Sequence, residues 1–100
     1  MEMVDEMKIP KEITISGITY SIRRNCKFDD DREGDLDWNI ALIRIKKNMC
    51  EDAEKITVLH EIVHGIDIAY LNGKFKEQFG EDGVDVLANA LYQIIPQLEE

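Results

Sequence analysis

Residues 56–71 read ITVLHEIVHGIDIAYL, and this stretch decides the fold that we expect for the chain. Drawn as a helix, it is apolar around most of its circumference, which is typical of a helix covered on two sides. Asn48 and Glu51 upstream match an N-cap and capping-box pair, and Asn72 followed by Gly73 is a common helix stop. The sequence therefore predicts one long, buried helix that lies between a sheet and a second helix.

Two alternating apolar patterns precede this helix and predict β-strands. The first is ITISGITYSIR at residues 13–23, which changes phase at Gly17, and the second is WNIALIRIK at residues 38–46. Between them, the acidic stretch at residues 29–37 has no apolar periodicity, so we expect a solvated loop there. The side chains of the first pattern that we expect to face the core are Ile13, Ile15, Ile18, Tyr20 and Ile22.

A second helix is predicted where apolar residues recur every three or four positions from Glu81 onward. Pro96 should end or kink its last turn. The order of elements is therefore strand, strand, long helix, helix. This order predicts an α+β fold, in which a small antiparallel sheet packs on the long helix and a C-terminal helix follows. We expect residues 11–100 to form this single domain and residues 1–10 to be a flexible N-terminal segment.

The composition is that of an ordinary globular protein, and the charge limits its partners. Of the 100 residues, 21 are acidic and 12 are basic, which gives a formal net charge of −9. A surface this negative repels phosphate backbones and anionic lipids, so we expect neither nucleic acid nor a membrane as a partner. No apolar run has the length of a signal peptide or a membrane span, so we expect a cytoplasmic protein. Cys26 and Cys50 lack the spacing of a zinc knuckle, which favours two reduced thiols.

The motif that carries chemistry is HEIVH at residues 60–64. Side chains four residues apart lie on one face of a helix, so His60 and His64 can present nitrogens to one ion at about 2.0–2.1 Å, which suits zinc. Glu61 projects beside the pair and can reach a water bound to the same ion. We therefore predict a zinc site with His60 and His64 as ligands and Glu61 as general base.

A catalytic zinc ion usually has three protein ligands and one open position. The chain has only two histidines, so a carboxylate from the C-terminal helix must supply the third ligand. Asp85 is the first choice, because its neighbours are apolar and a charge among them needs a partner. Glu81 is the alternative, although it also suits a solvated first turn of a helix, and Asp82 is a weaker candidate.

Three further side chains have two interpretations each. Asp67 lies on nearly the same helix face as the histidines, where it would either accept the N–H of a ligating imidazole or act as a cap. Tyr70 and Tyr92 would either polarise a substrate carbonyl from the rim of the site or pack as buried aromatic residues. The sequence leaves these alternatives open.

The runs TVLHEIVHGIDIAYL at residues 57–71 and VDVLANALYQII at residues 84–95 resemble the ImmA/IrrE-like metallopeptidases and related short phage-associated HExxH proteins of the gluzincin type. The resemblance covers the two helices well and the strands only loosely. It implies a minimal zincin-like fold and Zn²⁺ as the cofactor. Larger family members act on regulatory proteins, but the substrate of this chain cannot be inherited from the resemblance. From the predicted peptidase chemistry we expect a protein or peptide substrate, and a regulatory protein is one candidate.

Carried over by position, the resemblance implies that His60, His64 and Asp85 bind zinc and that Glu61 is the base. The family acid is commonly Glu, and Asp85 is one methylene shorter. Two functions follow as hypotheses. The first is a zinc metallopeptidase in which Glu61 activates a water for peptide-bond hydrolysis. The second is a zinc-stabilised, non-catalytic binding or regulatory module of phage origin, which the small size and the negative charge favour.

Overall fold

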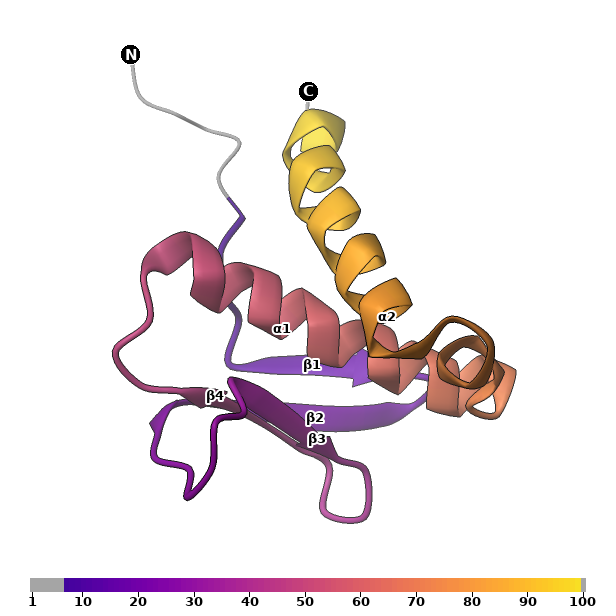
Figure 1. Cartoon of the computed structure of the whole chain (residues 1–100), viewed down its shortest axis with the longest axis horizontal. Coiled ribbons are helices and arrows are strands. Elements are labelled where there is room, and N and C mark those ends of the chain that lie inside the picture. The colour runs from indigo at the N-terminus through magenta and orange to yellow at the C-terminus, as the bar shows by residue number, and fades with distance from the viewer. Residues whose placement is uncertain (1–6, 100) are drawn as a thin grey trace.

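Four short strands form one sheet, and two helices lie above it in succession (Figure 1). The computed structural model describes residues 7–99. The predicted α+β fold is confirmed, with the order strands first and helices last. The elements are β1 (Glu12–Ile15), β2 (Ile18–Cys26), β3 (Gly34–Asp37), β4 (Leu42–Lys46), α1 (Glu51–Ile66), a π-helical turn (Asp67–Leu71), α2 (Lys74–Ile94) and a 3-10 turn (Ile95–Glu99).

The sheet has the strand order β1-β2-β4-β3. β1 and β2 form an antiparallel hairpin around Ser16 and Gly17, and β3 and β4 form a second antiparallel pair. β2 and β4 run parallel, so the sheet is mixed and differs in this pair from the antiparallel sheet that we expected. The reason is the additional strand β3, because a chain that reverses once into β3 and again into β4 returns to the direction of β2.

β3 lies within the acidic stretch that we expected to be a solvated loop, so that prediction is wrong for residues 34–37. Two contacts with residues outside the acidic stretch hold this strand. Leu36 packs against the hydrophobic core, and the carboxylate of Asp35 accepts a hydrogen bond from Nε of Arg44 on β4 at 3.0 Å. The strand predicted at residues 38–46 begins only at Leu42, since residues 38–41 form the turn between β3 and β4.

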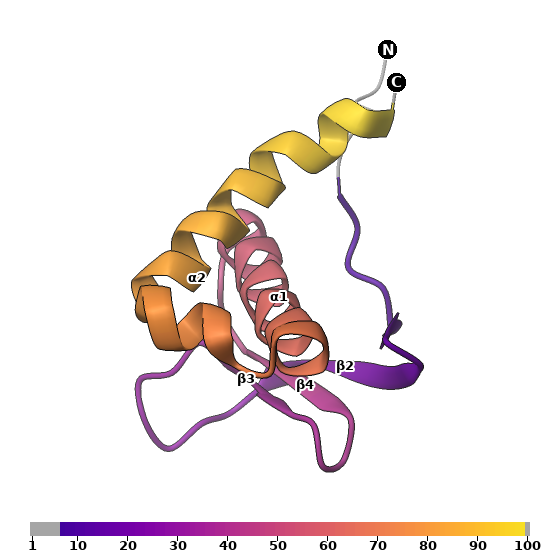
Figure 2. The same ribbon diagram turned by 90° about the vertical axis from the view of Figure 1, so that its right-hand side faces the viewer.

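The hydrophobic core lies between the sheet and α1. Its buried side chains come from one face of the strands and from the adjacent face of α1, and they are Ile15, Tyr20, Ile22, Ile43, Ile45 and Val58. α2 packs on the opposite face of α1, so α1 is covered on two sides as its apolar circumference predicted (Figure 2). Residues 1–6 of the predicted flexible segment lie outside the described residues, whereas Ile9 packs against this core.

The structure contradicts the predicted start of the long helix and confirms its predicted end. α1 begins after Cys50, and no side chain caps its first turn, so the predicted cap at Asn48 is wrong. Asn48 instead adopts a left-handed conformation with φ 65°, which Asn tolerates better than most residues. The predicted stop is confirmed, because Asn72 and Gly73 are both left-handed, with φ 59° and 79°.

Gly80 breaks α2 into two pieces. Its φ of 71° and ψ of −175° lie in a region that is essentially restricted to glycine. α2 begins at Lys74, earlier than predicted, and Gly80 interrupts it. The second piece begins at Glu81 and runs in a new direction. Beyond the break, Val84 and Ala88 are buried, and the last turns extend past α1 (Figures 1 and 2). Neither helix within residues 7–99 combines the length and the apolar content of a membrane span.

Candidate metal centre

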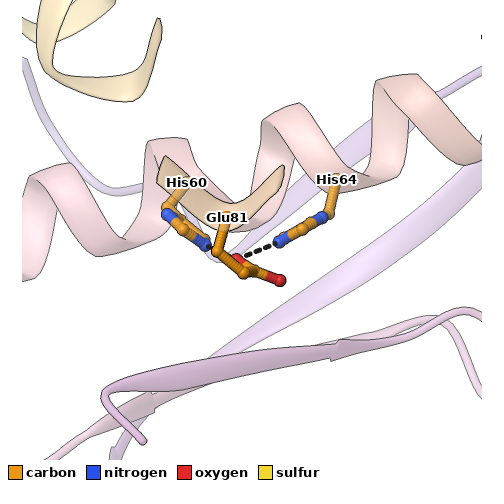
Figure 3. A group of neighbouring side chains, drawn as sticks. All are labelled: His60, His64 and Glu81. Atoms are coloured by element: carbon orange, nitrogen blue, oxygen red, sulfur yellow. Dashed lines mark hydrogen bonds and ion pairs between the residues drawn. The ribbon is translucent and has the colours of Figure 1, made fainter. Parts of the chain in front are cut away.

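Three side chains from two helices converge on one point (Figure 3). His60 and His64 lie one turn apart on α1, and Glu81 is the first residue after the break in α2. Oε1 of Glu81 lies 3.0 Å from Nε2 of His60 and 3.2 Å from Nε2 of His64. The cluster is therefore centred on a single carboxylate oxygen between two imidazole nitrogens.

The spacing of these donor atoms fits one metal ion. Ligands at about 2.0–2.1 Å from a tetrahedral ion are separated from each other by about 3.3 Å. The two measured distances are close to this value, and all three ligand atoms lie within 4.8 Å of one another. Within residues 7–99, these are the three grouped His, Cys or acidic residues that could hold a metal ion. Two histidines and one carboxylate form a donor set that catalytic zinc sites use with a fourth position left open.

Asp85, the expected third ligand, lies beside this cluster and outside it. Its Oδ1 lies 3.4 Å from Nδ1 of His60, the ring nitrogen that does not face Glu81. Glu81, our alternative, is the acid that the structure brings to both histidines, and Asp82 does not belong to the group. The break at Gly80 accounts for this arrangement, because it places Glu81 at the start of a helical piece and Asp85 one turn further along.

Glu61 lies next to the cluster and is almost completely buried, with 6 % of its surface exposed. Burial raises its pKa to about 7, and the neighbouring charge of His60 opposes this shift only in part. No hydrogen bond or ion pair joins its carboxylate to another residue in the described part of the chain. A carboxyl group with a pKa near neutrality can both accept and return a proton, which is the requirement for a general base.

Burial and neighbouring charges shift the pKa values of His64 and Glu81 in the cluster. Burial lowers the pKa of His64, although the charge of Glu81 opposes this effect. Burial alone would raise the pKa of Glu81, but the charge of His64 and hydrogen bonds from Lys76 and both histidines hold it below the usual value. Nζ of Lys76 lies 3.3 Å from Oε2 of Glu81, the oxygen that the histidines do not share. Both oxygens of this carboxylate are therefore fixed.

An open groove of about 820 Å³ contains the cluster and Glu61. One wall is formed by α1 and α2, and the opposite wall is formed by residues 32–36, which include most of β3. β3 is an edge strand in the sheet of the described residues. Gly34 allows the strand to approach α1 closely, because a Cβ at this position would lie 2.8 Å from Cγ2 of Thr57 and 3.5 Å from Oε2 of Glu61.

The structure also decides the roles that the sequence left open. Both carboxylate oxygens of Asp67 accept backbone N–H groups, those of Phe75 and Lys76 at 2.9 and 3.0 Å, so this residue caps the start of α2. Tyr92 donates a hydrogen bond to Asp52, and Tyr70 is largely exposed to solvent. Neither tyrosine lines the groove.

Sequence reasoning did not identify Lys76 or Gly34 as parts of the site. The acidic stretch around Gly34 gave no strand pattern, and Lys76 precedes the predicted start of the C-terminal helix. Cys26 and Cys50 are both free thiols.

We compared the chain with protein-family models, curated proteins and solved structures, and none of them matches it. The function must therefore be inferred from the site.

Proposed function

We propose that this protein is a zinc-dependent hydrolase of peptide bonds. The observation that carries the proposal is the convergence of His60, His64 and Glu81 beside a buried carboxyl group, that of Glu61. The carboxyl group of Glu61 opens onto the groove but is otherwise buried, and this burial makes its charged form costly at neutral pH unless a positive charge is near. Beside a bound metal ion, Glu61 would act as a general base.

His60, His64 and Glu81 would hold the zinc ion. When bound by two imidazoles and one carboxylate, zinc lowers the pKa of a water molecule to about 7 and polarises a carbonyl group. Asp85 supports this assignment, since a carboxylate beside Nδ1 keeps a proton on that nitrogen and leaves Nε2 free to bind a metal.

Glu61 performs the proton transfers. It accepts a proton from the water whose oxygen attacks the peptide carbonyl carbon, and the electron pair of the C=O bond moves to the carbonyl oxygen. When the C–N bond breaks, Glu61 gives the same proton to the leaving amine nitrogen. The raised pKa of Glu61 favours both transfers near neutral pH.

The groove suits a peptide in an extended conformation. β3 lines it with the backbone of an edge strand, and such an edge can pair with an added strand through N–H and C=O groups. A protein segment that pairs with β3 would pass beside Glu61, because Gly34 of this strand lies close to that carboxylate. We therefore propose a protein or peptide substrate, which a regulatory protein would satisfy.

The experiment that tests the function compares the wild-type protein with Glu61→Gln, each loaded with one equivalent of zinc. Casein and a pool of internally quenched peptides serve as substrates. We expect the variant to retain zinc and to lose about 10²–10⁴-fold in cleavage rate, the usual contribution of a general base. Equal rates for the two proteins would contradict the proposal, and His60→Ala is the control that should lose both zinc and cleavage.

A second candidate function is the zinc-stabilised binding module. One observation favours it: residues 86–98 carry no charged side chain, and Val86 and Leu98 in this segment are 70 % and 75 % exposed. Exposed apolar surface of this kind often marks an interaction site. A partner that remains intact with both the wild type and Glu61→Gln, and is released by Leu98→Lys, would support the binding module over the hydrolase.

A further inference from the structure

We propose that Lys76 is a catalytic residue that binds the carbonyl oxygen of the substrate as this oxygen becomes negatively charged. The proposal rests on the hydrolase function proposed above and adds a group that the site otherwise lacks. Peptide hydrolysis develops negative charge on the carbonyl oxygen, and a fixed hydrogen-bond donor that meets this charge accelerates the reaction. The groove must supply this donor.

The other side-chain donors that line the groove are each held by an acceptor of the protein itself. Arg32 donates to the carboxylates of Asp30 and Asp35, at distances of 2.7–3.1 Å. The hydroxyl of Thr57 donates to the backbone oxygen of Ala53 at 2.8 Å, inside α1. Nδ2 of Asn89 donates to the backbone oxygen of its own helix at residue 85. The histidines are the predicted ligands. Among these side chains, Lys76 is the donor whose ammonium group lies beside the ligand carboxylate of Glu81.

Lys76 has both the free donors and the position. An ammonium group carries three N–H donors, and the bond to Oε2 of Glu81 at 3.3 Å uses one of them. The ammonium group is close enough to Glu61 and His64 for its charge to affect the pKa of each. Lys76 lines the same groove as Glu61 and the metal ligands, so a substrate bound there can reach the remaining donors.

The backbone of Lys76 is also held in place. Its N–H donates to Oδ2 of Asp67 at 3.0 Å, and Asp67 is buried at the end of α1. Lys76 and Glu81 lie on opposite sides of the break at Gly80, so their ion pair spans the two pieces of α2. The backbone contact and the ion pair keep the side chain at the groove, and 55 % of the Lys76 side chain stays exposed, so a substrate can reach its ammonium group. A donor held beside the reacting carbonyl can stabilise the charge that develops on its oxygen.

The step that we assign to Lys76 involves no proton transfer. The water oxygen forms a bond to the carbonyl carbon, the water proton moves to Glu61, and the electron pair of the C=O bond moves to oxygen. Lys76 donates a hydrogen bond to that oxygen while the charge persists. When the C–N bond breaks, the electron pair returns to form the C=O bond, and the hydrogen bond weakens again.

The first experiment compares Lys76→Met with Lys74→Met, which removes the same charge from the same helix outside the groove. With casein as substrate and zinc at a concentration that saturates both variants, we expect Lys76→Met to lower kcat by about 10²–10³-fold and to leave KM within about threefold. Lys76→Arg should recover part of the loss. Equal kcat for the two methionine variants would overturn the proposal, and so would a loss of zinc affinity large enough to explain the fall in kcat.

The second experiment does not depend on catalysis. Inorganic phosphate, a tetrahedral anion, is titrated into cobalt-substituted protein while the visible absorption of the metal is followed. We expect Lys76→Met to bind phosphate at least about tenfold more weakly than Lys74→Met, because the charged donor is lost. If the wild type cleaves no substrate but this difference is found, the hydrolase function fails and the anion-binding role of Lys76 stands. If the two variants bind phosphate equally, the role of Lys76 fails.

Discussion

Asp85 and Glu81 face opposite nitrogens of the same imidazole ring. Oδ1 of Asp85 lies 3.4 Å from Nδ1 of His60, and Oε1 of Glu81 lies 3.0 Å from Nε2. A carboxylate beside one ring nitrogen orients the ring and makes the other nitrogen a better ligand. The two acids that the sequence offered as competing ligands therefore occupy complementary positions on His60.

The first prediction separates these roles by zinc affinity. Glu81→Ala removes a proposed ligand and should cause the largest loss. Asp85→Ala should weaken binding by about 10–100-fold, the usual effect of removing a residue that orients a ligating histidine. Competition with a chromophoric chelator measures both values, and Asp82→Ala is the matched control that should not change them. Retention of zinc by Glu81→Ala together with its loss in Asp85→Ala would make Asp85 the ligand.

The second prediction concerns pH and the metal-free protein. Glu61 has a pKa of about 7 in the folded state against 4.5 ordinarily, so between these values the folded state binds more protons than the unfolded state. The free energy of unfolding therefore falls as the pH rises through this window, by about 3 kcal/mol from this group. Gln stays neutral, so metal-free Glu61→Gln should lack this loss.

Urea unfolding in the presence of a chelator at pH 4.5 and pH 8 provides the measurement for Glu61. We expect the stability of Glu61→Gln relative to the wild type to increase from the lower to the higher pH. A difference that does not change with pH would show that Glu61 has an ordinary pKa in the folded protein. Saturating zinc should reduce the difference at pH 8, because a nearby cation stabilises the ionised carboxylate.

The third prediction tests the close approach of β3 to α1. A Cβ at residue 34 would lie 2.8 Å from Cγ2 of Thr57 and 2.9 Å from the backbone oxygen of Arg44. Gly34→Ala should therefore push β3 away from the groove and cost about 1–3 kcal/mol of stability, as overpacking usually does. Thermal unfolding measures the loss. Adding Thr57→Ser removes the methyl group and should restore part of the stability, and no restoration would argue against a steric cause.

The fourth prediction tests the break at Gly80. Alanine strongly disfavours φ 71° with ψ −175°, so Gly80→Ala should favour a continuous helix and turn Glu81 away from the histidines. We expect zinc affinity to fall at least about tenfold. Gly17→Ala introduces similar strain at φ 82°, in open space on the β1–β2 turn, and is the control that should keep its zinc affinity. Equal affinities would show that the break does not position Glu81.

The sequence predicted those elements whose periodicity or turn residues lie within the element itself. The buried helix and its stop at Asn72 were predicted correctly, because periodicity and stop residues determine them. The predicted change of phase at Gly17 coincides with the turn between β1 and β2, although the pattern alone did not distinguish two strands from one bent strand. β3 was missed because contacts outside the acidic stretch stabilise it, namely its pairing with β4, which includes Asp35 with Arg44, and the packing of Leu36 on the core. No pattern within the acidic stretch itself reports such a contact.

For the candidate site, the sequence predicted the pair of histidines and left the third ligand between Asp85 and Glu81. The spacing of His60 and His64 places them on one helix face whatever the tertiary structure is, whereas the third ligand depends on how a second helix approaches. Our preference for Asp85 used the apolar character of its neighbours, which reports burial but not direction. The glycine immediately before Glu81 was the relevant feature, because a change of helix direction at Gly80 decides which acid reaches the histidines.

The position of Glu81 immediately after Gly80 has a mechanical consequence. His64 and Glu81 are 17 residues apart in sequence, so an ion bound to both would close the intervening chain into a loop, as a disulfide does, but reversibly. The core between the sheet and α1 includes neither of the buried residues of α2, Val84 and Ala88. Such an ion would add a reversible cross-link to the packing of α2 on α1, in which Val84 and Ala88 are buried. Removing it should loosen the second helix before the core between the sheet and α1.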